Sequence, residues 1–183
     1  MKRDLPLAYP DMKIGLFGGT FDPAHEGHAH VAETALKRLG LDRIWWLVSP
    51  QNPLKPKSSP LTERVSSARA VAHGAKMVVT DLEAQLGCAF TYQTLRALKR
   101  LYPGVSFTLI MGADNLATFR KWRNWREVAE AIPVAIVARP GASAAHRLSA
   151  PRGWTYLNAR LHRESSTAIR SGKRAALAKP KRK

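Results

Sequence analysis

Short apolar runs alternate along this chain with longer stretches in which hydrophobic residues recur every three or four positions. The apolar runs predict buried strands, and the periodic stretches predict amphipathic helices. Regular alternation of the two is typical of an α/β protein with a parallel sheet. The expected fold is therefore a doubly wound, mainly parallel sheet with helices on both faces.

The predicted boundaries follow these patterns and the turn residues between them. The stretch from Ser49 to Leu61 holds four prolines and no apolar period, so it predicts a loop, with Thr62 capping the next helix. Trp45 and Trp46 lie in an apolar run and are expected mainly to pack in the core. Strands are expected near 13–17, 43–48, 76–80, 106–111, 133–138 and 154–157, and helices near 26–39, 62–73, 91–101, 125–131 and 167–176.

The joint between the first strand and the first helix carries the candidate chemistry: it reads Gly-Gly-Thr-Phe-Asp-Pro-Ala-His-Glu-Gly-His over residues 18–28. Glycines let a ligand approach the backbone, and a helix N-terminus offers N–H groups to an anion. His25 and His28 lie about one helical turn apart, so both rings can face one ligand. A triphosphate suits this arrangement. The alternative is an exposed turn with incidental histidines.

Two further predicted strands end where a ligand would bind. In a doubly wound sheet, ligands bind beyond the carboxyl ends of the strands, near the point where the strand order reverses. The second strand ends at the proline-rich loop, and the fourth ends at Met111-Gly112-Ala113-Asp114. The sequence has neither the three-glycine dinucleotide fingerprint nor a P-loop, which disfavours a hydride-transfer enzyme and a P-loop kinase.

Length and composition narrow the class of protein. The chain has 183 residues, 45% of them hydrophobic, and one cysteine, so it can form a sizeable core without disulfides or a multi-cysteine metal site. We expect one domain over 12–176, an N-terminal extension over 1–11 and a disordered basic tail over 177–183. No apolar run is long enough to cross a bilayer and no signal peptide is visible, so a cytoplasmic location is expected.

The net charge of +17 requires an explanation of its own. It fits either a basic surface or an anionic partner, and a nucleic-acid-binding module is the alternative from a different class of function. No zinc-finger or RNA-recognition signature is present, so nucleic acid is not the expected partner. The basic C-terminal residues explain only part of the excess. They are Lys173, Arg174, Lys179, Lys181, Arg182 and Lys183.

These motifs resemble those of a known family. Residues 18–28 match the pattern GGTFDPxHxGH at every fixed position, and Ser165 to Arg170 match a second pattern, ISSTxIR, with Glu164 in place of the leading Ile. The chain is similar to the nucleotidyltransferase superfamily marked by (His/Thr)-x-Gly-His and, within it, to the bacterial nicotinate-nucleotide adenylyltransferase family. Three more stretches agree: residues 52–55, residues 90–95, and residues 112–114 followed by Trp122.

The resemblance implies a Rossmann-like fold and a reaction in NAD biosynthesis. ATP would transfer its adenylyl group to nicotinate mononucleotide, with Mg²⁺ on the ATP phosphates and no protein metal site. His28 would contact the reacting phosphate, with His25 in support and Arg170 holding the departing pyrophosphate. The implied ATP contacts are Gly18, Gly19, Thr20, Phe21, His25, His28, Gly112, Asp114, Ser166, Thr167 and Arg170. The implied mononucleotide contacts are Gly19, Thr20, Lys55, Thr91 and Trp122.

Several of these residues have a structural alternative. Ser166 and Thr167 could be an ordinary helix cap, and Lys55 a solvated loop residue. Trp122 is the candidate platform for the pyridine ring, but either it or Trp125 is expected to belong to the core.

The pattern leaves other functions open. The nearest rival is another member of the superfamily, such as a pantetheine-phosphate adenylyltransferase or a cytidylyltransferase. The preference between nicotinate and nicotinamide mononucleotides is also open, and the chain could form a homo-oligomer.

Overall fold

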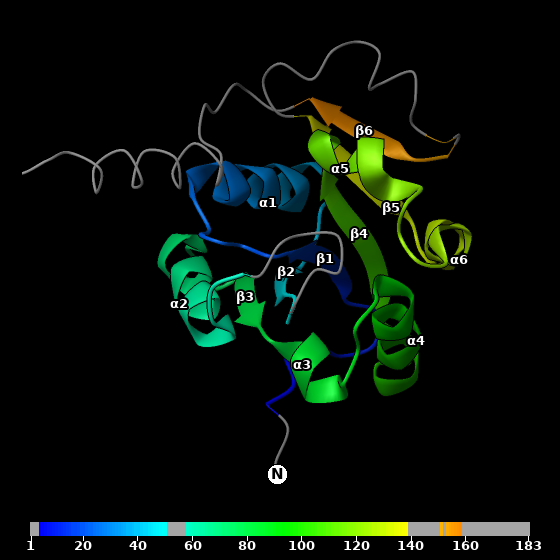
Figure 1. The fold of residues 1–183 in the computed structure, drawn as a ribbon. Coiled ribbons are helices and arrows are strands. Elements are labelled where there is room, and N and C mark those ends of the chain that lie inside the picture. The colour runs from blue at the N-terminus through cyan, green and yellow to red at the C-terminus, as the bar shows by residue number, and fades with distance from the viewer. Residues whose placement is uncertain (1–3, 51–57, 139–150, 152, 159–183) are drawn as a thin grey trace, which may run out of the picture.

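Six strands form one parallel sheet in the order β3-β2-β1-β4-β5-β6 (Figure 1). The computed structural model describes residues 4–50, 58–138, 151 and 153–158. The six strands lie close to the predicted positions, which confirms the expected α/β fold. They are β1 (Lys13–Gly19), β2 (Arg43–Val48), β3 (Met77–Thr80), β4 (Ser106–Gly112), β5 (Val134–Ala138) and β6 (Thr155–Asn158).

Four of the described helices are those that the hydrophobic period predicts, and two short ones are new. The prediction that Thr62 caps the second helix is wrong, because Pro60 is the N-cap and Thr62 lies inside the first turn. The predicted helix at 167–176 lies outside the described residues. The predicted helices are α1 (Glu26–Arg38), α2 (Leu61–Val71), α4 (Thr91–Leu101) and α6 (Trp125–Ala131); the new ones are α3 (Leu82–Leu86) and α5 (Ala113–Phe119).

Successive strand residues enter two different hydrophobic clusters. Phe17 and Trp46 pack with α1 and α2 on one face of the sheet. Leu16 and Trp45 pack with α3, α4 and α6 on the other face. Both tryptophans are fully buried, which confirms their packing role. Because side chains alternate across a strand, two adjacent buried tryptophans require helices on both faces.

The strand order places the switch point at β1 (Figure 1). β1 lies between β2 and β4, and the chain winds outward from it in both directions. Gly19 pairs with Val48 at the carboxyl ends of β1 and β2. The predicted convergence of the first, second and fourth strand ends is therefore confirmed, and a crevice at this edge is where such a fold binds ligands.

Candidate functional site

Residues 18–28, which we call the glycine turn, contain two histidines that accept hydrogen bonds from backbone N–H groups at the N-terminus of α1. His25 is the N-cap, and its Nδ1 accepts a hydrogen bond from the backbone N–H of Gly27 at 3.1 Å. Nδ1 of His28 accepts one from the backbone N–H of His25 at 3.2 Å. A neutral imidazole that accepts at Nδ1 carries its proton on Nε2. Both Nε2 atoms are therefore donors, the kind of group that binds a phosphate oxygen.

His28 is held in place by aromatic neighbours. Its ring centroid lies 3.9 Å from that of His25 and 5.1 Å from that of Phe21, which it meets edge to face. His25 is almost fully buried at 3% exposure, whereas His28 is half-buried. The structure thus brings the two predicted residues together, with His28 the more accessible of the pair.

Gly18 and Gly19 have different surroundings. Among the described residues, no atom lies within 4 Å of a Cβ built on Gly18, so none of them blocks the approach of a ligand to this backbone. A Cβ on Gly19 would lie 3.0–3.2 Å from the ring of Phe21. That ring is buried. The backbone of Phe21 is left-handed, with φ of 48°, a conformation that side-chain-bearing residues rarely adopt. Gly19 therefore accommodates Phe21, and Gly18 leaves space at the site.

Thr20, which follows the two glycines of the turn, has a buried hydroxyl. The residue is 6% exposed, and its Oγ1 has no hydrogen-bond partner among the described residues. Buried hydroxyls are nearly always hydrogen-bonded, so such an atom calls for a partner. Its position in the turn fits the predicted contact with a nucleotide.

Two further predicted site residues, Gly112 and Asp114, lie at the carboxyl end of β4, at the same edge of the sheet. Gly112 is buried at the end of the strand, and α5 begins immediately after it. Asp114 lies exposed in the first turn of α5. Its carboxylate can accept hydrogen bonds from a ribose, as the sequence predicts.

Thr91 is the first residue of α4, where the helix offers its N-terminal amides. Oε1 of Gln93 accepts hydrogen bonds from the backbone N–H groups of Ala89 and Phe90 at 3.0 and 3.2 Å. This arrangement fixes the start of the helix at Thr91. A helix N-terminus favours a carboxylate, which is the group that distinguishes nicotinate from nicotinamide.

The buried carboxyl group of Glu83 in α3 holds α4 through a hydrogen bond. Glu83 of α3 accepts a hydrogen bond from Oγ1 of Thr94 at 2.9 Å, and Thr94 is fully buried. Burial raises the pKa of Glu83 to about 7, and the Thr94 hydrogen bond partly opposes that shift. The sequence pattern does not reveal Glu83, because α3 is too short to show an apolar period.

Trp122 and Trp125 are both half-buried and both pack against the core cluster that contains Phe119, so the structure does not single out one of them as the core residue. They pack on the buried ring of Phe119, at centroid distances of 5.3 and 6.1 Å. Arg120 and Arg126 lie over the Trp125 ring. Trp122 keeps part of its surface exposed, as a stacking platform requires.

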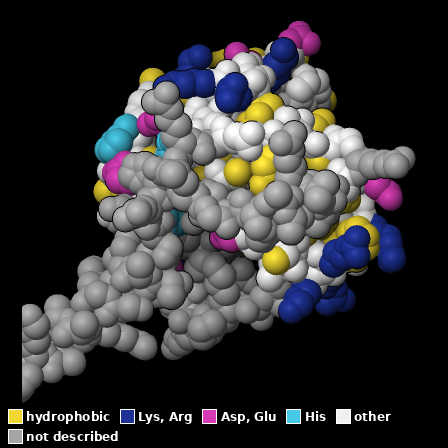
Figure 2. Space-filling model, turned by 90° about the horizontal axis from the view of Figure 1, so that it is seen from above, with side chains coloured by type: hydrophobic (Ala, Val, Ile, Leu, Met, Phe, Trp, Pro, Cys, Tyr) yellow, Lys and Arg dark blue, Asp and Glu magenta, His cyan; other side chains and the backbone are white. Residues whose placement is uncertain are grey.

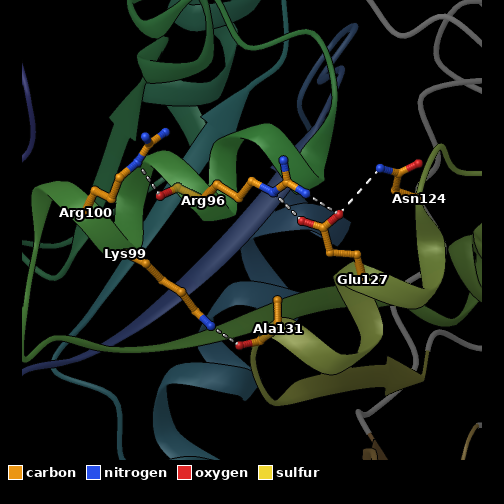
Figure 3. A network of polar contacts seen from close by, with 6 residues as sticks. All are labelled: Arg96, Lys99, Arg100, Asn124, Glu127 and Ala131. Carbon is orange, nitrogen blue, oxygen red and sulfur yellow. Dashed lines mark hydrogen bonds and ion pairs between the residues drawn. The ribbon is translucent and has the colours of Figure 1, made fainter.

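Polar contacts join α6, which carries Trp125, to α4 (Figure 3). Arg96 binds Glu127 in a bidentate ion pair, and Asn124 contacts the same carboxylate. Lys99 donates to the carbonyl oxygen of Ala131. The contacts are largely exposed, so each contributes little to stability, but together they join the two helices at several points.

Four predicted contacts lie outside the described residues: Lys55, Ser166, Thr167 and Arg170.

The described part adds two residues that the sequence pattern does not reveal. Arg64 and Ser67 of α2 both contact the backbone of the glycine turn. Each looks like an ordinary helix-surface residue in the sequence, so only the packing reveals them.

Two properties of the described residues bear on cofactors and location. They hold no cluster of three or more His, Cys, Asp or Glu side chains suited to a metal ion. None of their helices combines the length and the apolar character needed to span a membrane.

Comparison with known proteins places the chain in a family. The family described as cytidylyltransferase-like matches residues 16–172. A probable nicotinate-nucleotide adenylyltransferase from Roseobacter denitrificans is 44% identical over 194 aligned residues, which cover 93% of this chain and 98% of the relative. Another from Cereibacter sphaeroides is 50% identical over 166 residues, covering 90% and 86%.

The fold is also that of a solved nucleotidyltransferase. Nicotinic acid mononucleotide adenylyltransferase from Plasmodium falciparum, complexed with NaAD, aligns with a TM-score of 0.71 and 18% identity over 87% of this chain and 83% of that one. At this identity the likeness shows the fold alone. On the evidence of its sequence relatives, the chain belongs to the cytidylyltransferase-like family and, within it, to the nicotinate-nucleotide adenylyltransferases, which are nucleotidyltransferases.

Proposed function

We propose that this protein transfers the adenylyl group of ATP to nicotinate mononucleotide, giving nicotinate adenine dinucleotide and pyrophosphate. The observation that carries the proposal is the reciprocal cap of His25 and His28 beside the open backbone of Gly18. It forms an anion site at the switch point of the sheet. The relatives, which are named for this reaction, supply the identity of the substrates.

The chemistry needs positioning more than it needs a protein nucleophile. A phosphate oxygen of the mononucleotide attacks the α-phosphorus of ATP, and the bond from that phosphorus to the oxygen bridging to the β-phosphate breaks. Pyrophosphate takes the bonding electrons. Because the attacking phosphate is already ionised, the protein lowers the barrier by aligning the reactants and by stabilising negative charge on the oxygens.

His28 contributes directly to that stabilisation. Its Nδ1 is occupied by the capping bond, so its Nε2–H is oriented as a fixed donor. Directed at the α-phosphate, this donor binds the transition state more tightly than the ground state, since the charge on the oxygens changes there. His25, which is more deeply buried, holds the helix entrance that orients His28.

The mononucleotide would bind between α4 and the Trp122 segment. The amides at Thr91 would hold the carboxylate, Trp122 would stack on the pyridine ring, and Asp114 would accept from a ribose hydroxyl. Lys55, Ser166, Thr167 and Arg170 are proposed as contacts to the phosphates. Each is a cation or a hydroxyl donor suited to that role.

A divalent cation, which we propose is Mg²⁺, would enter on the phosphates of ATP. Mg²⁺ keeps several waters and prefers substrate phosphates to all-protein cages, so phosphate oxygens would supply most of its ligands. It would neutralise charge on the pyrophosphate. We propose a cytoplasmic location, where both nucleotides are available.

The test is a pyrophosphate-release assay with ATP and either mononucleotide. We expect turnover with nicotinate mononucleotide and a lower kcat/KM with nicotinamide mononucleotide, because an amide gains less from the α4 N-terminus. Parallel filter binding with RNA tests the rival class. No release from either mononucleotide, together with tight, salt-sensitive RNA binding, would overturn the proposal.

A further inference from the structure

One face of α2 makes direct contact with the backbone of the glycine turn. Arg64 on this face is 2% exposed, and its Nη1 donates to the carbonyl oxygen of Thr20 at 2.8 Å. The same Nη1 donates to the carbonyl oxygen of Ser49 at 2.7 Å, and Nη2 donates to that of Pro50 at 2.7 Å. One guanidinium therefore ties the turn after β1 to the carboxyl end of β2.

The fourth donor of Arg64 completes the arrangement. Its Nε donates to the carbonyl oxygen of Ser59 at 2.8 Å, just before α2 begins. All four acceptors are peptide carbonyls. Burial lowers the pKa of Arg64, and the nearby negative charge of Asp22 partly offsets this shift. Arginine stays protonated in proteins, so a positive charge lies buried directly behind the turn.

Ser67 lies one helical turn further along the same face. Its Oγ accepts from the backbone N–H of Ala24 at 3.2 Å. The same hydroxyl lies 3.4 Å from the carbonyl oxygen of Phe21 and 2.9 Å from that of Arg64. Arg64 and Ser67 thus contact the peptide carbonyls on either side of Phe21, the residue with the left-handed backbone.

These contacts bear on phosphate binding in two ways. They hold Phe21 in a left-handed backbone conformation that side-chain-bearing residues rarely adopt. The Arg64 guanidinium, which donates to the Thr20 carbonyl oxygen, also polarises the peptide bond between Thr20 and Phe21. This polarisation makes the backbone N–H of Phe21 a stronger hydrogen-bond donor. A turn fixed and polarised in this way is ready to receive anionic oxygens.

We propose that Arg64 and Ser67 are positioning residues of the nucleotide site, which fix the backbone of Thr20 and Phe21 in the geometry that receives the ATP phosphates. The inference rests on the proposed function of the turn. Neither side chain acts on the substrate directly; both act through the backbone.

Ser67→Ala tests the proposal with little risk to folding, and Ser66→Ala is its control because Ser66 is exposed on the same helix. We expect Ser67→Ala to lower kcat/KM for ATP about tenfold at a temperature well below Tm, since a small misplacement of a phosphate-binding group lowers the rate strongly. Ser66→Ala should match the wild type. A merely structural role would lower Tm and leave kcat and KM unchanged.

Arg64→Lys tests the guanidinium itself, with the exposed Arg69→Lys as its control. Lysine keeps the charge but cannot supply the same planar set of donors, so we expect kcat to fall about a hundredfold. Arg69→Lys should behave as the wild type. If Arg64→Lys does not fold, Ser67→Ala decides alone. Wild-type kcat and KM, within twofold, in every Arg64 and Ser67 variant that folds would overturn the proposal.

Calorimetric titration with ATP separates this proposal from the proposed function. If the wild type binds ATP but makes no dinucleotide, the proposed function fails, and weaker ATP binding by Ser67→Ala still supports the positioning role. If the wild type makes the dinucleotide and every Arg64 and Ser67 variant that folds matches it in ATP affinity and kcat, the positioning role fails and the function stands.

Discussion

Gly18 and Gly19 are adjacent in the turn, but a side chain would have opposite effects at the two positions. Gly18→Ala adds a methyl group that meets no described residue within 4 Å, so the free energy of unfolding should change by less than about 0.5 kcal/mol. The methyl group would occupy the space proposed for the nucleotide, so KM for ATP should rise about tenfold or more.

Gly19→Ala is the matched comparison. Its methyl group would press on the buried ring of Phe21, which is packed against Phe17 and Trp46. We expect it to destabilise the fold by roughly 1–3 kcal/mol, measured by chemical denaturation. Equal effects of the two substitutions on stability and on KM would contradict the assigned surroundings.

His28 has two functions that one pair of substitutions can separate. His28→Asn can keep an acceptor for the His25 N–H but removes the Nε2 donor, whereas His28→Ala removes both. Both should lower kcat by two orders of magnitude or more, as loss of a transition-state donor does. Only His28→Ala should also lose about 1 kcal/mol of stability with the cap.

His73→Ala is the control, since His73 is exposed beyond the end of α2. It should leave kcat and stability unchanged. Retention of kcat within threefold by His28→Asn would mean that the cap alone explains His28 and that the proposed phosphate contact is wrong.

At the scale of elements, α3 is joined to α4 by a carboxyl group that titrates near neutral pH. Glu83 has a pKa of about 7 in the folded protein against 4.5 as its ordinary value. Its protonated form is favoured by folding, so its contribution is full below about pH 4.5 and is lost as the pH rises through about 7. The loss is on the order of 3 kcal/mol.

Glu83→Gln should remove this pH dependence. Urea denaturation between pH 5 and about 8 should show the wild type losing stability relative to Glu83→Gln as pH rises. The exposed Glu130→Gln should track the wild type. A constant difference between wild type and Glu83→Gln across the range would rule out a buried, mostly protonated carboxyl group.

The elements also show what the sequence could and could not predict. Long periodic segments such as 91–101 were located to the residue, because their apolar period is set by the core they face. α3 spans five residues, too short for an apolar period to emerge, and α5 follows β4 directly, with no loop between them to mark its start. Arg64 was missed because a buried arginine and a solvated one look alike until packing places carbonyls around the guanidinium.

The candidate site likewise has features that the sequence reveals and features that only the folded structure reveals. The glycine turn and its histidines were recognisable, because glycine, Asx-Pro and spaced histidines have few other uses together at a strand-to-helix joint. The tautomers of His25 and His28 could not be predicted, because they depend on which backbone N–H donates to each Nδ1 in the folded chain. The support of α4 by Glu83 likewise depends on a contact between separate helices.

At the scale of the whole molecule, the net charge of +17 bears on how anionic substrates arrive. Lys and Arg side chains gather in groups on the face seen in Figure 2. Such a field raises the rate of encounter with ATP and a mononucleotide, and salt screens it. Raising the ionic strength from about 0.05 to about 0.5 M should therefore lower kcat/KM while kcat changes little.

Steady-state kinetics over a salt series checks this prediction, with Tm followed at each salt concentration as the control for stability. A fall in kcat equal to the fall in kcat/KM would assign the salt effect to the chemical step rather than to encounter.

In the proposed reaction a bond forms to the α-phosphorus of ATP, and the bond from that phosphorus to pyrophosphate breaks. The most direct measurement follows ATP labelled at its α-phosphorus in a reaction with nicotinate mononucleotide, with products separated by chromatography. We expect the label to appear in nicotinate adenine dinucleotide, with one unlabelled pyrophosphate per dinucleotide, and His28→Asn nearly to abolish both products. Label that stays in ADP or AMP without a dinucleotide would mean that the protein does not transfer the adenylyl group to this substrate.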